Sequence, residues 1–169
     1  MNKSGFTLFE SIIYIAIFSI VATALVTFTL HISTARNKSY AIQSVNAQMR
    51  LAVLTITDAV KQATAVNTGA STFDTDPGVL SLQMLDASKD PTIFSLTGDN
   101  GRLQVSEGGN PAVPVTDSDL SITKFIFTNL SPVSGADSIR MVADVMYASS
   151  TGIEFFYQTS VTSTASTRL

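Results

Sequence analysis

Apolar residues are most concentrated near the N-terminus, where residues 11–30 carry no formal charge. A run of about 20 such residues is long enough to cross a bilayer as a helix, and its strongly apolar side chains favour insertion by roughly 3 to 7 kcal/mol. One acid, Glu10, stands at the start of the run. A carboxylate at membrane depth is costly and normally has a partner. The pattern therefore predicts a membrane helix with a carboxylate at its N-terminal end.

The predicted helix continues well beyond the apolar run. No proline precedes Pro77, and no glycine lies between Gly5 and Gly69. An uninterrupted helix from about Thr7 to about Asn67 is therefore expected, roughly 90 Å long at 1.5 Å per residue. Because the apolar run contains no proline, no sharp kink is expected in it. Gly69 and the two residues before it predict the C-terminal stop.

The second half of this helix is amphipathic. Its apolar residues recur at alternating spacings of four and three, with polar residues between them: Val45, Met49, Ala52, Ile56, Ala59 and Ala63. This spacing places them on one face of a helix. We expect a half-exposed stem that packs this face onto the following domain.

From Gly69 onward, alternating apolar residues and turn residues predict β structure. The predicted strands are residues 79–84, 92–96, 102–105, 120–127, 138–147 and 153–161, with a hairpin turn at 98–101. Ile139, Met141, Ala143 and Val145 would form one face of their strand. One long helix followed only by strands predicts an α+β fold, in which the C-terminal half of the helix lies across an antiparallel sheet.

The first ten residues carry a more specific pattern. Met1–Gly5 is a short leader, and Phe6-Thr7-Leu8-Phe9-Glu10 follows it directly. This opening resembles the type IV pilin and type II secretion pseudopilin family. The resemblance implies that a prepilin peptidase cuts after Gly5 and N-methylates Phe6. It also implies that Glu10 faces the free amine of a neighbouring subunit.

Two physical arguments support this interpretation. A five-residue leader is too short for a secretory signal peptide, whose own apolar region would be removed with it. The nearest basic residue to Glu10 outside the leader is Arg36, which a helix places well over 30 Å away at about 1.5 Å per residue. Glu10 therefore has no obvious partner in its own chain. The alternative is a plain signal anchor, in which Glu10 lies at the headgroup level.

The resemblance also divides the chain and names its partners. It implies a leader (1–5), a transmembrane and assembly helix (6–32), an amphipathic stem helix (33–68) and an extracytoplasmic β-rich head (69–169). The expected partners are other pilin or pseudopilin subunits, the prepilin peptidase, the inner-membrane assembly platform and membrane lipid. The leader would lie in the cytoplasm. Residues 48–63 and 124–127, and the chain end, loosely resemble J-type pseudopilins and W-type minor pilins, which favours a minor subunit.

Charge and composition narrow the possible functions. The stem is basic, whereas acids outnumber bases beyond Gly69, and the chain's net charge is −3. An acidic head argues against direct binding of nucleic acid. The chain has no cysteine, so the disulfide-closed loop that many pilins carry cannot form.

Few residues are candidates for other chemistry. His31 is the only histidine, so neither a metal cluster nor a serine triad is expected, and we predict a protein that is not an enzyme and has no cofactor. Asp74 with Asp76, and Asp117 with Asp119, could bind Ca²⁺ but are better interpreted as solvated turn acids. Tyr14 could face lipid or pack on neighbouring stems. A membrane-anchored binding domain that never polymerises remains the alternative function, and retention of the leader would favour it.

Overall fold

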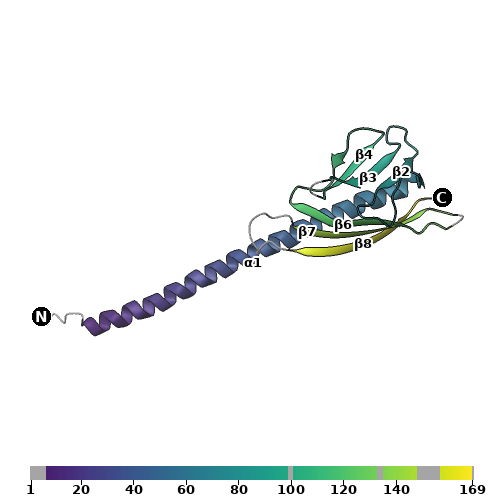
Figure 1. Ribbon diagram of the computed structural model, residues 1–169. Helices are drawn as coiled ribbons and strands as arrows, with labels where there is room; N and C mark the ends of the chain where they lie inside the picture. Colours follow the sequence, from purple (N-terminus) through teal and green to yellow (C-terminus); the bar gives the residue numbers. More distant parts are fainter. Residues whose placement is uncertain (1–6, 99–100, 133–134, 148–156, 169) are drawn as a thin grey trace.

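The computed structural model describes residues 7–98, 101–132, 135–147 and 157–168. One long helix, α1 (Leu8–Gln62), projects from a head of β-strands that packs against one face of its C-terminal part (Figure 1). The strands are β1 (Ala63–Val66), β2 (Leu80–Met84), β3 (Thr92–Leu96), β4 (Leu103–Glu107), β5 (Val113–Pro114), β6 (Leu120–Asn129), β7 (Ser138–Tyr147) and β8 (Gln158–Ser166). This arrangement confirms the predicted α+β fold.

The strands form two antiparallel sheets rather than the single sheet that the sequence predicted. One sheet has five strands in the order β1-β2-β3-β4-β5, and the other has three in the order β6-β7-β8. Both sheets contribute to one core that includes the buried face of α1, and its largest fully buried side chains are Phe94, Phe125 and Phe127. The head is therefore one domain assembled around the end of the helix.

Helix α1 is continuous over 55 residues, about 80 Å at 1.5 Å per residue. Thr7 caps its N-terminus, because its Oγ1 accepts a hydrogen bond from the Glu10 N–H at 3.3 Å. The helix ends at Gln62, so the predicted continuation to Asn67 and the stop at Gly69 were wrong. Ala63 has extended backbone angles, and β1 pairs with β2 from this residue onward.

The predicted stem face is largely confirmed. The buried residues of α1 are Ala41, Val45, Met49, Ala52, Ile56 and Val60. Four of these were predicted, whereas Ala59 is only half-buried and Val60 takes its place. Ala63 is buried as expected, but it belongs to β1. This face packs mainly on β7 and β8.

Most strand predictions agree with the structure to within a few residues. Strands β3 and β7 have the predicted bounds, and the predicted face of β7, from Ile139 to Val145, is buried. The short strands β1 and β5 were missed. β8 runs later than expected, and residues 153–156 of the predicted strand lie outside the described residues. The central residues of the predicted 98–101 turn, 99–100, also lie outside them.

A buried hydroxyl offers a test of this core. Ser81 is fully buried in β2, and its Oγ makes no hydrogen bond with any described residue. An unsatisfied buried hydroxyl costs about 1 to 3 kcal/mol, so we expect Ser81→Ala to raise the free energy of unfolding by about 1 kcal/mol. Thr92 is an informative control, because its buried Oγ1 donates to the Lys89 carbonyl at 2.8 Å. Thr92→Ala should destabilise in the same denaturant titration, and a loss of stability in both variants would contradict the assignment of Ser81.

Candidate functional site

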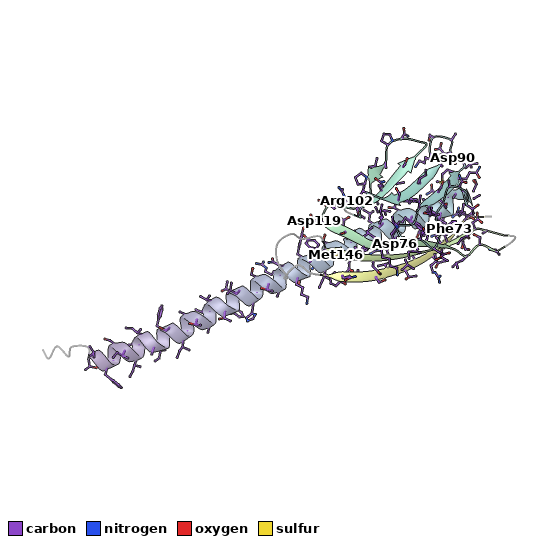
Figure 2. The ribbon with its side chains drawn as sticks, viewed as in Figure 1. Phe73, Asp76, Asp90, Arg102, Asp119 and Met146 are labelled. Carbon is purple, nitrogen blue, oxygen red and sulfur yellow. The ribbon has the colours of Figure 1, made fainter. Side chains whose placement is uncertain are left out.

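The N-terminal half of α1 is an uncovered apolar surface. Its large hydrophobic side chains between Leu8 and Leu30 are 42% to 81% exposed. An 18-residue window of this helix has a mean hydropathy of 2.3, and none of that window is buried. Figure 2 shows these side chains standing away from the helix with no part of the head beside them. The segment has the length and composition of a membrane span, and its surface needs a cover of lipid or protein.

The polar residues within this apolar half are satisfied locally. Ser19, Thr23, Thr27 and Thr29 each donate their hydroxyl to the backbone carbonyl four residues earlier, at 2.7 to 2.9 Å. No hydroxyl of these four needs water, which suits a helix surrounded by hydrocarbon. The hydroxyls therefore do not weaken the predicted membrane segment.

Glu10 lies in the first turn of α1. Its backbone N–H is held by the Thr7 cap, and its side chain is exposed. Within the described part of the chain, the only ion pair joins Lys89 to Glu107 in the head, at 3.6 Å, so no described cation pairs with Glu10. The carboxylate also lies at the positive end of the helix dipole, where a negative charge is favourable. Gly5 and Phe6, the other predicted site residues, lie outside the described residues.

The remaining residues that the sequence singled out on α1 bring no further chemistry together. His31 is exposed on the helix, and the described residues contain no cluster of three or more His, Cys, Asp or Glu side chains suited to a metal. Tyr14 is 55% exposed on the apolar surface, so both interpretations of Tyr14 stay open.

In the two acid pairs of the head, three carboxylates accept hydrogen bonds from the protein: Asp74, Asp76 and Asp117. The Asp74 carboxylate accepts from Thr128 Oγ1 at 2.8 Å, and that of Asp76 accepts from the Phe125 N–H at 3.0 Å. Both contacts hold the loop before β2 against β6. Asp117 accepts from the Ser118 N–H at 2.7 Å. These contacts give Asp74, Asp76 and Asp117 a structural role.

Sequence reasoning missed the junction between the stem and the head. Tyr40 on α1 meets Tyr147 at the end of β7, with ring centroids 6.4 Å apart in an edge-to-face arrangement. Beside them, Asp117 donates its backbone N–H to the Gln48 side chain of α1 at 3.1 Å. Gln48 and Asp117 lie 69 positions apart along the chain and Tyr40 and Tyr147 lie farther apart still, so no local pattern could have indicated these contacts.

The junction makes a prediction for alkaline pH. Burial, with the nearby Asp119 carboxylate, raises the pKa of Tyr147 above its ordinary value of 10.0. Its contribution to stability is therefore complete below about pH 10 and is lost as the pH rises through the folded-state pKa. In an ultraviolet titration of tyrosinate, Tyr147→Phe should remove a phenol that ionises above pH 10. Loss of a phenol that ionises near pH 10 would contradict this.

Comparison with protein families bears on the N-terminal segment. Residues 1–26 match the family model described as the prokaryotic N-terminal methylation motif. The chain carries the type IV pilin and pseudopilin signature. The match covers the leader and most of the uncovered apolar surface of α1. No curated protein and no solved structure matches the chain.

The pilin signature and the structure agree on the organisation of the protein. A pilin-type motif together with a long apolar N-terminal helix fits a membrane-anchored protein with a C-terminal domain. The head begins to cover α1 at Ala41, the first buried residue of the helix. The signature is that of a prepilin-peptidase substrate and of a structural subunit that assembles with other pilins.

Proposed function

We propose that this chain is a prepilin-like minor subunit, cut after Gly5, N-methylated at Phe6 and assembled through α1 into a type IV pilus or a type II secretion pseudopilus. The observation that carries the proposal is the uncovered apolar half of α1, most of which lies within the matched methylation motif. Its role is mechanical. Before assembly the apolar half holds the subunit in the bilayer, and after extraction it packs against the same segment of neighbouring subunits.

Glu10 would set the position of each subunit along the filament. Cleavage after Gly5 creates an amine on Phe6, and the exposed Glu10 carboxylate has no described cation in its own chain. An amine from a neighbouring subunit would neutralise the Glu10 carboxylate. A single buried ionic pair is best known for fixing register between helices, because any other axial offset leaves a charge unpaired in an apolar environment.

The proposal also assigns location and partners. The subunit would reside in the inner membrane with its leader in the cytoplasm and its head outside, before it joins the filament. The prepilin peptidase, the inner-membrane assembly platform and other pilin subunits would be its partners. The loose resemblance to J-type pseudopilins and W-type minor pilins supports a minor role.

Fractionation tests assembly directly. The full chain would be expressed in a host with an active pilus or pseudopilus machinery, and filaments would be separated from membranes. We expect the chain in the filament fraction only when the prepilin peptidase is active, and the variant Gly5→Arg, which alters the cleavage site, should remain in the membrane. A chain found wholly in the membrane beside an active peptidase would contradict the proposal and favour a binding domain that does not polymerise.

A further inference from the structure

Strand β8 leaves one edge of the three-stranded sheet open. The Tyr147 N–H donates to the Tyr157 carbonyl at 3.0 Å, and the Thr167 N–H donates to the Asp137 carbonyl at 2.8 Å. Hydrogen bonding alternates along an antiparallel pair, so every second residue from 157 to 167 bonds to β7. The backbone N–H and C=O groups of the intervening residues therefore point away from the sheet: Gln158, Ser160, Thr162, Thr164 and Ser166.

These outward groups have no partner in the part of the chain that the structure describes. The side chains of the same five residues are exposed, whereas the residues between them are half-buried or buried. The backbone and the side chains of this edge are thus both accessible. A row of unpaired N–H and C=O groups is a template for another strand.

The opposite edge of the same sheet is closed. On β6, the Phe125 N–H binds the Asp76 carboxylate and the Phe125 carbonyl accepts from the Gly78 N–H. The Phe127 carbonyl accepts from the Asp74 N–H at 2.8 Å. The loop before β2 therefore occupies the positions that an added strand would need.

The five-stranded sheet also has protected edges. Strand β5 has only two residues, and Pro114 lacks an N–H. Strand β1 has four residues and an irregular register with β2 between Ala63 and Ala65. By contrast, β8 has 9 residues with no charge and no proline, and its pairing with β7 has no register shift. Strand β8 therefore lacks the charges, prolines, bulges and short length by which edge strands usually avoid pairing with another strand.

The direction of β8 limits what can occupy this edge. β8 runs in the same sense as α1 (Figure 1). A symmetric β8–β8 pair of two copies would be antiparallel and would point the two stems in opposite directions, which two helices anchored alike in one membrane cannot do. A second copy in the same orientation would offer its β6 edge, which runs parallel to β8, and that edge is closed.

We propose that the β8 edge receives a parallel strand from a different membrane-anchored pilin-like subunit of the same assembly. The proposal rests on the proposed function, because shared anchoring is what excludes the symmetric pair. Backbone hydrogen bonds to the five outward residues would hold the added strand. The edge would then select a partner in which the strand corresponding to β6 is open. Two neighbouring copies of this chain would not pair in this way, because their β6 edges are closed.

A proline at the centre of the edge tests the proposal. Thr162→Pro removes an N–H that has no described partner, and it places a ring where the added strand would lie. Thr162→Ala loses the same side chain but keeps the N–H, so it is the matched control. We expect the proline variant to be at least tenfold less abundant in the filament fraction than the alanine variant, with equal cleavage and equal thermal stability of the head. Equal abundance of the two variants in filaments would overturn the proposal, whereas a wild-type chain that never enters filaments would instead refute the proposed function.

Crosslinking identifies the occupant without relying on the proline variant. The chain has no cysteine, so Thr162→Cys labelled with a benzophenone maleimide in membranes of the assembling host gives a single reporter. The expected adduct joins residue 162 to an extended segment of a different protein that carries its own N-terminal methylation motif. An adduct with β8 or β6 of a second copy, or no adduct in membranes that assemble the wild-type chain, would overturn the proposal.

Discussion

Replacing Glu10 by glutamine is expected to leave cleavage after Gly5 intact and to reduce assembly at least about tenfold, equivalent to about 1.4 kcal/mol. Glutamine has nearly the same shape but cannot neutralise an amine. In an assembled core the unpaired amine of the neighbouring subunit would then be buried, which is costly. The effect should appear only on assembly, because Glu10 is exposed and pairs with no described cation in the single chain.

The measurement is the ratio of this chain in filaments to this chain in membranes, with the N-terminus of each pool determined by mass spectrometry. Glu107→Gln is the matched control, because it makes the same chemical change at a surface acid of the head whose ion pair with Lys89 is about half exposed. An exposed pair contributes only about 0.2 to 1 kcal/mol, so assembly of this control should stay near wild type. Normal incorporation of the Glu10→Gln chain would refute the role assigned to Glu10.

The second large effect is expected in the head. Phe127 is fully buried in β6, and its ring stacks edge-to-face on Phe125 with centroids 4.8 Å apart. Phe127→Ala should lower the free energy of unfolding by about 3 to 5 kcal/mol, because it removes a large apolar side chain and leaves a cavity. Most single domains have only about 5 to 15 kcal/mol of stability, so this variant should be close to unfolded at physiological temperature.

Thermal unfolding of the full chain in detergent, followed by the circular dichroism of the strands, tests this prediction. Leu85→Ala is the control, because Leu85 is 87% exposed and a surface change away from special features costs within about 0.5 kcal/mol. A loss in Phe127→Ala no larger than that of the control would show that the core is not packed as described.

Sequence patterns predicted the elements whose signal is local. The uncharged run and the absence of proline and glycine predicted one long helix. The spacing of the apolar residues from Val45 to Ile56 predicted its buried face. The alternation over residues 138–147 gave β7 with its bounds. In each case the signal lies within a few turns of helix or a single strand, so periodicity alone was enough.

The end of α1 was missed because its cause is not local. Residues 63–66 fit the end of an amphipathic helix as well as they fit a strand. Pairing with β2, and burial of Ala63 and Val66, favour the extended form. The division into two sheets falls between β5 and β6, because these two consecutive strands do not pair with each other, whereas all other consecutive strands do.

For the candidate site, the sequence identified the acid and the apolar surface but not their surroundings. The local hydroxyl bonds from Ser19 to Thr29 follow from residue types in a helix, so they could have been anticipated. The contact of Tyr40 with Tyr147, and the contrast between the open β8 edge and the closed β6 edge, depend on tertiary structure.

The intact mass and the N-terminal residue of the membrane-extracted protein, with and without an active prepilin peptidase, test the central claim most directly. The proposal predicts a chain that begins at Phe6 and carries one added methyl group when the peptidase is active, and a chain that begins at Met1 when it is not. A chain that begins at Met1 in both samples would contradict the proposed processing. It would also remove the amine on which the assembly role of Glu10 depends.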